Sequence, residues 1–204
     1  MLTSKRSTSS VAAGDMIERL RNGFATSAQN GRQGMRPILD ACCGSKMFWF
    51  NHHNPNVLYV DNRRMNAEAI WKSGNGKGTR YCKVDPDLVA DFRNLPFPSE
   101  SFWHVVFDPP HLKSVGETAW MAKKYGKLPK YWMPYIHNGF HECLRVLKPF
   151  GTLIFKWNET QIPTKEVIAA IGMQPLYGHK SGRLSKTHWM AFVKLPEMED
   201  SITL

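Results

Sequence analysis

Two consecutive prolines, separated from an apolar run by a single acid, constrain the fold of this chain most strongly. The run covers residues 105–107, and Asp108, Pro109, Pro110 and His111 follow it. An apolar run bounded by turn residues is typical of a buried β-strand. The prolines fix φ and remove N–H donors, so the strand must end there. We therefore expect a carboxylate and an unbonded carbonyl at the carboxyl end of a strand, where open α/β sheets bind ligands.

The Asp108 carboxylate and the Pro109 carbonyl are two acceptors that could hold the two hydrogens of an amino group. A conjugated amine is a poor nucleophile because its lone pair is delocalised into the ring. Two acceptors that pull on its hydrogens favour a tetrahedral nitrogen with a freed lone pair, mainly in the transition state. Taken alone, the stretch is equally compatible with a purely structural role, in which Asp108 ends a strand and the two prolines form a turn.

This stretch resembles the D-P-P-[YFW] motif of the S-adenosylmethionine-dependent amino-methyltransferases, which methylate N6 of adenine or N4 of cytosine. The resemblance implies that Asp108, Pro109, Pro110 and His111 form the catalytic stretch and that the side chain of residue 111 packs on the base. His111 stands where the family has Tyr, Phe or Trp. An imidazole can stack in the same way, and its unperturbed pKa lies near neutral pH.

Three further predicted strands contain or end in an acid, at Asp40, Asp61 and Asp91. The first, over residues 37–42, is followed by a turn at Gly44 and by residues 46–52, which we expect to open a helix. This unit looks like the first cofactor loop of class I methyltransferases, where glycine lets the backbone approach the cofactor. Asp61 follows Asp40 by about 20 residues, the spacing of the acid that binds ribose hydroxyls in nucleotide-binding α/β folds. The resemblance implies S-adenosylmethionine as cofactor, bound by Asp40, Cys42, Gly44, Asp61, Asn62, Asp91 and Phe92.

Strand and helix signals alternate along most of the chain, which favours an α/β fold with a largely parallel sheet. The resemblance supplies the detail: a Rossmann-like, seven-stranded class I methyltransferase domain over residues 35–195, with an N-terminal extension (1–34) and a loose tail (196–204). The remaining expected elements are helices over residues 12–24, 65–71, 137–147 and 165–171, a flexible loop at 73–78, a strand at 152–157, and an antiparallel hairpin of strands at 175–178 and 187–194.

Two basic stretches are possible nucleic-acid-binding surfaces. The net charge of +10 favours a polyanionic partner, although a basic surface kept for solubility explains it equally well. In the insertion at 112–136, lysines alternate with aromatic residues, a pattern that suits unstacked nucleic acid. The predicted nucleic-acid-binding residues there and in the 179–189 connector are Lys113, Lys123, Lys124, Trp132, His179, Lys180, Arg183, Lys186 and His188. A solvated loop and a basic hairpin tip are the alternatives.

The four cysteines include no C-x-x-C pair, so the sequence predicts neither a zinc site nor any other metal site. Free thiols and the lack of a long apolar run favour a reducing cytoplasm without membrane contact. The chain also looks like the compact methyltransferases encoded by phages and prophages, for which the compartment would be the host cytoplasm. The sequence leaves the oligomeric state open.

The leading hypothesis is an S-adenosylmethionine-dependent N-methyltransferase that transfers a methyl group in line to N6 of adenine in DNA. A duplex substrate would require base flipping. Three alternatives remain: a methyltransferase of RNA bases, one of protein or small-molecule amines, and a nucleic-acid-binding homologue that has lost catalysis.

Overall fold

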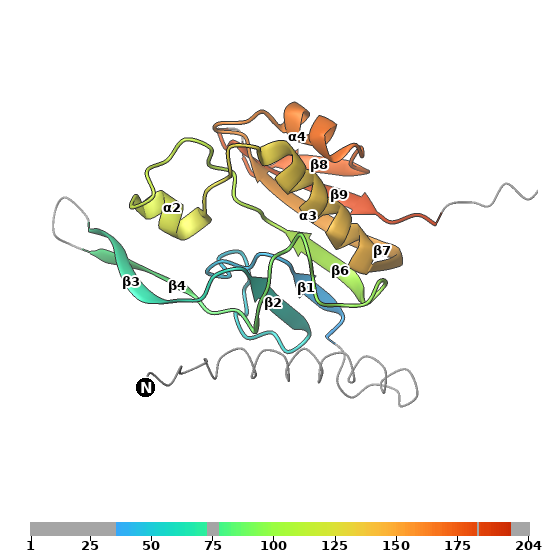
Figure 1. Ribbon diagram of the computed structural model, residues 1–204, viewed down its shortest axis with the longest axis horizontal. Helices are drawn as coiled ribbons and strands as arrows, with labels where there is room; N and C mark the ends of the chain where they lie inside the picture. Colours follow the sequence, from blue (N-terminus) through green and yellow to red (C-terminus); the bar gives the residue numbers. More distant parts are fainter. Residues whose placement is uncertain (1–35, 73–77, 183, 197–204) are drawn as a thin grey trace, which may run out of the picture.

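The computed structural model describes residues 36–72, 78–182 and 184–196. Seven strands form the main sheet in the spatial order β5-β2-β1-β6-β7-β9-β8 (Figure 1). All of its pairings are parallel except those that β9 makes with β7 and β8. The predicted α/β, Rossmann-like class with a C-terminal antiparallel hairpin is therefore confirmed. The strands are β1 (Ile38–Asp40), β2 (Val57–Asp61), β5 (Leu88–Val89), β6 (Phe102–Phe107), β7 (Leu147–Asn158), β8 (Tyr177–Lys180) and β9 (Thr187–Val193).

The direction of the strand order reverses between β1 and β6. The chain first builds outwards through β2 and β5, then returns to place β6 on the other side of β1. Asp40 lies beside Val106 in the register of this parallel pair, and the Ala41 N–H donates to the Val106 carbonyl over 3.0 Å. The carboxyl ends of β1 and β6 therefore meet at the kind of switch point where doubly wound sheets bind ligands.

Two helices, α3 (Trp132–Val146) and α4 (Thr164–Ile171), cover one face of the sheet (Figure 1). Buried side chains of α3 recur every three to four residues, at Trp132, Ile136, Phe140 and Cys143, which is the period of an amphipathic helix. Phe140 packs against Phe155 and Phe192 of the sheet, with ring centroids 6.0 and 4.9 Å apart. This aromatic core fixes the sheet beneath the site. Gly172 ends α4 with a left-handed φ of 72°, as its sequence predicts.

Residues 65–71, predicted to form a helix, instead form the strand β3 (Met65–Lys72). It pairs in antiparallel fashion with β4 (Thr79–Val84). The two strands form a ribbon that extends away from the main sheet (Figure 1). The helix prediction was wrong because a partner strand beyond a glycine-containing connection overrides the local preference of these residues.

Residues 46–52 form turns rather than the predicted helix opening. Lys46 has a φ of 56°, which an α-helix cannot contain. The aromatic side chains that follow bind the sheet instead: the Trp49 indole donates to Asp40 over 2.7 Å, and the Phe48 ring meets the Trp189 ring edge-on at 5.4 Å. The conformation of residues 46–52 is therefore set by the contacts of Phe48 and Trp49 rather than by helical hydrogen bonds.

The insertion at 112–136, in which the sequence shows no clear period, contains the short helix α2 (Trp120–Tyr125) and the first turn of α3. The predicted helix at 12–24, residues 73–77, Arg183 and residues 197–204 lie outside the described residues. In the described ranges, no helix is both long and apolar enough to cross a bilayer.

Candidate active site

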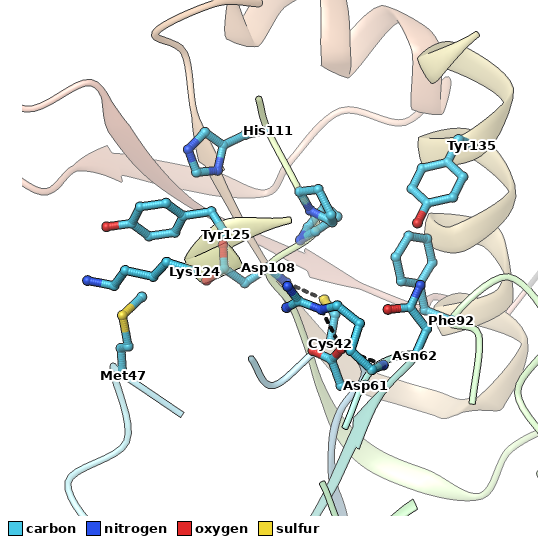
Figure 2. Close-up of a pocket in the computed structure, with 13 residues that line it drawn as sticks. Cys42, Met47, Asp61, Asn62, Phe92, Asp108, His111, Lys124, Tyr125 and Tyr135 are labelled. Carbon is cyan, nitrogen blue, oxygen red and sulfur yellow. Dashed lines mark hydrogen bonds and ion pairs between the residues drawn. The ribbon is translucent and has the colours of Figure 1, made fainter. Parts of the chain in front are cut away.

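A single pocket lies beyond the carboxyl ends of β1, β2 and β6. Figure 2 shows His111, Tyr125 and Lys124 grouped on one side of it and Tyr135 on the other. The pocket brings together all four residues of the predicted catalytic stretch and four of the predicted cofactor residues. Its lining consists of Cys42, Met47, Asp61, Asn62, Arg63, Phe92, Asp108, Pro109, Pro110, His111, Lys124, Tyr125 and Tyr135.

Asp61, the predicted ribose acid, fixes the turn after β1. Its side chain is almost completely buried, and Oδ2 accepts a hydrogen bond of 2.9 Å from the Gly44 N–H. Gly44 has a left-handed φ of 49°, and a Cβ added there would meet no atom within 4 Å. The turn therefore presents an open backbone beside a buried acid.

Arg63 holds the other oxygen of Asp61. Asp61 Oδ1 accepts from the Arg63 backbone N–H over 2.9 Å and from Arg63 Nε over 3.1 Å. Arg63 Nη1 also donates to the Lys123 carbonyl in α2 over 3.1 Å. The Arg63 guanidinium therefore connects the pocket acid to the insertion.

Asp40 and Asp91 do not line the pocket, although the sequence placed both at the cofactor. Asp40 is fully buried and accepts from Trp49 Nε1 over 2.7 Å; burial raises the pKa of Asp40 to about 7, against the lowering effect of that hydrogen bond. Asp91 pairs with Arg93 over 2.5 Å, which lowers its pKa. Asp40 therefore orders the segment after β1, and it is Phe92, the neighbour of Asp91, that lines the pocket.

Asp108 has a partner that the sequence did not predict. Its Oδ2 accepts a hydrogen bond of 2.5 Å from Lys156 Nζ, and its backbone N–H donates to Cys42 Sγ over 3.2 Å. Burial raises the pKa of Asp108, and the Lys156 ammonium opposes that rise. Since Lys156 is the one side-chain donor to this carboxylate in the described part of the chain, Oδ1 and the Pro109 carbonyl are the acceptors available to a substrate.

The ring of His111 lies among aromatic side chains. Its centroid is 5.4 Å from that of Tyr125 and 6.4 Å from that of Trp157. Burial, with a smaller contribution from Lys156, lowers the pKa of His111 to about 4. The expectation that His111 titrates near neutral pH is therefore wrong, because desolvation keeps the imidazole uncharged at pH 7.

The predicted nucleic-acid-binding residues fall into different environments. Lys123 pairs with Glu68 over 2.8 Å. Lys180 and His188 each lie 3.0 Å from Glu159, whose pKa falls to about 2 through the hydrogen bonds with His188 and Lys180. Among the described residues, no ion pair involves Lys113, Lys124, His179 or Lys186.

Trp132 is buried in the hydrophobic core with only 6 % of its surface exposed. Its ring therefore has no free face for a base, which corrects its prediction as a nucleic-acid contact. Arg183 lies outside the described residues.

Sequence reasoning missed the role of Lys156 and of the pocket residues Met47, Arg63, Tyr125 and Tyr135. The sequence did contain a signal for Lys156. Side chains alternate along a strand, so a lysine between the buried aromatic residues Phe155 and Trp157 lies on the opposite face of the sheet from them. In the ranges that the structure describes, no cluster of three or more His, Cys, Asp or Glu side chains could hold a metal ion.

No protein-family model and no curated protein matches the chain. Three solved structures align with the chain at low similarity. An S-adenosylmethionine-dependent methyltransferase from Leishmania major is 15% identical, with a TM-score of 0.45 over 88% of this chain and 72% of that one. The 1,6-didemethyltoxoflavin-N1-methyltransferase of Burkholderia thailandensis is 14% identical, with a TM-score of 0.44 over 96% and 92%. A protein from Pyrococcus horikoshii is 14% identical, with a TM-score of 0.34 over 93% and 78%.

Proposed function

We propose that the chain is an S-adenosylmethionine-dependent methyltransferase that acts on an exocyclic amine of a nucleobase, with N6 of adenine in DNA as the favoured target. One observation carries this proposal: Asp61 and Asn62, at the end of β2, line the same pocket as residues 108–111, at the end of β6. An acid for ribose hydroxyls and an acceptor pair for an amine therefore face one common space.

The residues of the pocket suit S-adenosylmethionine. Asp61 supplies a buried carboxylate for ribose hydroxyls and Phe92 an apolar wall for the adenine ring, while Gly44, whose N–H holds Asp61, lies next to the pocket rather than in its lining. When bound, the cofactor supplies an electrophilic methyl group on a sulfonium centre. The residues of the chain bind and orient the two reactants so that the amine lies in line with that methyl group.

The substrate side suits a flat, uncharged ring that carries an amino group. His111 is uncharged at neutral pH and lies beside Tyr125, so the two can pack on a base without requiring charge on it. Asp108 Oδ1 and the Pro109 carbonyl accept the hydrogens of the amine. Bound S-adenosylmethionine would supply the methyl group to the nitrogen lone pair, and the proton that the nitrogen releases would pass to Asp108 or to solvent.

A small heteroaromatic amine is the second candidate substrate. The observation that favours it is the pairing of Lys180 and His188 with Glu159, which reduces the basic surface available to phosphates. Asp108 Oδ1 and the Pro109 carbonyl would hold the amino group of either candidate in the same way. Only assays with each class of substrate can therefore distinguish the two.

The decisive experiment is incubation with methyl-labelled S-adenosylmethionine and a panel of DNA, RNA, protein and free heteroaromatic amines. Mass identification of the digested products should show N6-methyladenine in the DNA. Methylation confined to RNA or to the free amines would replace the DNA assignment. Cofactor binding by calorimetry without any transfer would instead support a homologue that has lost catalysis.

Asp108→Asn should abolish transfer and leave cofactor affinity within about threefold of the wild type, because its partner is the substrate amine. Asp91→Asn is the matched control: it also changes an acid that follows a strand, but this acid pairs with Arg93 outside the pocket. If Asp108→Asn keeps most of the wild-type turnover, the acceptor role is wrong.

A further inference from the structure

Lys156 lies next to Asp108 because of the register of two parallel strands. Phe107 of β6 pairs with Phe155 of β7, so the residues that follow them, Asp108 and Lys156, are neighbours. Nζ lies 2.5 Å from Asp108 Oδ2, and each of the two side chains is 19% exposed. The ion pair therefore lies behind the pocket, and Asp108 alone of the two lines it.

Two aromatic rings fix the Lys156 ammonium in place. Nζ lies 5.3 Å from the centroid of Phe48 and 5.6 Å from that of Trp189, both within reach of cation–π attraction. Trp189 is directly opposite Lys156 in the β7–β9 register, and its indole donates to Ser181 Oγ over 3.0 Å. With the carboxylate on one side and two rings on the others, the cation has a defined position.

Stability alone does not account for this pair. A largely buried ion pair often stabilises a protein no better than apolar side chains of similar volume. If both members of the pair were replaced, an apolar side chain at 156 would have Phe48 and Trp189 to pack against. Stability alone therefore does not explain why a charge directed at Asp108 stands at this position.

The electrostatic need for that charge is clear from the surroundings of Asp108. Burial favours its protonated form, and the Lys156 ammonium opposes this. A protonated carboxyl presents a hydrogen towards an amine instead of accepting one. The titratable and charged groups around Asp108 in the site are Asp40, Cys42, Asp61, Arg63, His111, Lys124, Tyr125, Tyr135 and Lys156.

We propose that Lys156 is a positioning residue for methyl transfer: its ammonium group holds Asp108 ionised and oriented through Oδ2, so that Oδ1 remains an acceptor for the substrate amine. The catalytic part of this inference rests on the proposed function. The ionisation part concerns the residues of the chain alone and can be measured without substrate.

The direct test is a ¹³C NMR titration of protein labelled at the aspartate carboxyl carbons, with the Asp108 signal identified by its loss in Asp108→Asn. In Lys156→Met the titration midpoint of Asp108 should rise by about 1–3 pH units, the usual effect of losing an adjacent opposite charge. Lys156→Arg retains the charge and should keep the midpoint close to that of the wild type. Equal midpoints in the wild type and Lys156→Met would overturn the proposal.

The activity test follows the pH dependence of kcat at saturating S-adenosylmethionine. Transfer requires ionised Asp108, so activity is lost as pH falls through its pKa. This acid limb should therefore move to higher pH in Lys156→Met and return in Lys156→Arg, with cofactor Kd unchanged. A uniform loss of kcat at every pH would indicate a structural role and contradict the proposal. Failure of the wild type to methylate any substrate would refute the proposed function, while the NMR midpoint would still decide the role of Lys156.

Folding is controlled in two ways. The double variant Asp108→Asn/Lys156→Met removes both charges and should unfold at a temperature close to that of the wild type. If Lys156→Met does not fold, Lys156→Gln, which keeps a hydrogen-bond donor but no charge, replaces it in both experiments with the same expected upward shift.

Discussion

Both acids that line the pocket are held by a cation, Asp61 by a residue two positions along the chain and Asp108 by a residue of the neighbouring strand. Arg63 binds Asp61 through Oδ1, and Lys156 binds Asp108 through Oδ2. In each case the second oxygen faces a different partner: the Gly44 N–H for Asp61 and, as proposed, the substrate for Asp108. Fixed carboxylates of this kind reduce the reorganisation that the site must undergo during the reaction.

The burial of His111 predicts a pH-dependent stability. Its pKa is about 4 in the folded protein against about 6.5 in an unfolded chain, so between these values the unfolded state binds more protons. Wild-type stability should therefore fall by about 1–3 kcal/mol, relative to His111→Phe, as pH decreases from 6.5 to 4. Urea unfolding of both proteins across this range measures the difference, and the other histidines cancel. Parallel pH profiles would show that His111 is not desolvated.

The sequence could predict the two acids but not the cation that holds Asp108. Asp61 and Asp108 each end an apolar run, and a strand end is a local pattern that can be read directly. The pairing of Lys156 with Asp108 spans 48 positions and depends on the alignment of two strands. Trp132 shows the reverse error: an aromatic residue in a lysine-rich stretch was assigned to the surface, whereas the period of α3 places it in the core.

Local patterns succeeded where packing agreed with them and failed where a distant partner decided the structure. The buried run of β2 and the glycine-capped α4 have the bounds expected within a residue. Residues 65–71 contain good helix formers, but β4 pairs with them and makes a strand. Two runs of strand length joined through a glycine-rich connection are themselves typical of a hairpin, so the sequence does contain a signal for β3 and β4.

Helix α2 is coupled to residues 108–111 by a close backbone contact. Gly126, which ends α2, has a φ of 74°, and a Cβ there would lie 2.9 Å from Pro110 Cγ. Gly126→Ala should therefore displace Pro110 together with the neighbouring acceptors, reducing kcat at least tenfold as well as costing about 1–3 kcal/mol of stability.

Gly172→Ala is the matched control for this variant. Gly172 has a φ of 72°, but a Cβ there would meet no atom within 4 Å. It should lower Tm and leave kcat unchanged. Thermal unfolding and steady-state kinetics on both variants make the comparison, and equal losses of kcat would exclude a specific effect at Pro110.

The net charge of +10 is not distributed as a uniform basic surface. Some predicted phosphate contacts are neutralised within the molecule, as Lys123 is by Glu68 and Lys180 by Glu159. Lys124, which lines the pocket, and the exposed Lys186 have no such acidic partner among the described residues. The side chains that are free to bind phosphates, and so to release counterions from the nucleic acid, are therefore fewer than the composition suggests.

Two double variants of equal net charge test this division. Lys124→Ala/Lys186→Ala should weaken DNA binding and reduce the slope of log K against log salt by up to about two. Lys123→Ala/Lys180→Ala should have a smaller effect on both quantities, since each lysine already neutralises a carboxylate. Fluorescence anisotropy across a salt series measures both. Equal slopes in the two variants would show that net charge alone attracts the nucleic acid.

The reversed direction of β9 has a practical consequence for anchoring the molecule. Because β9 is antiparallel to β7, its last residues lie beside the start of β7, and Lys194 exchanges backbone hydrogen bonds with Phe150 and Gly151. The chain enters β1 at the same margin, where the Pro37 carbonyl accepts from the Trp103 N–H at the start of β6. Both entry to and exit from the sheet are therefore at the margin opposite Asp108. A fusion partner or an immobilising surface attached through either end of the sheet would leave the pocket facing away from it and open to a polymer as long as DNA.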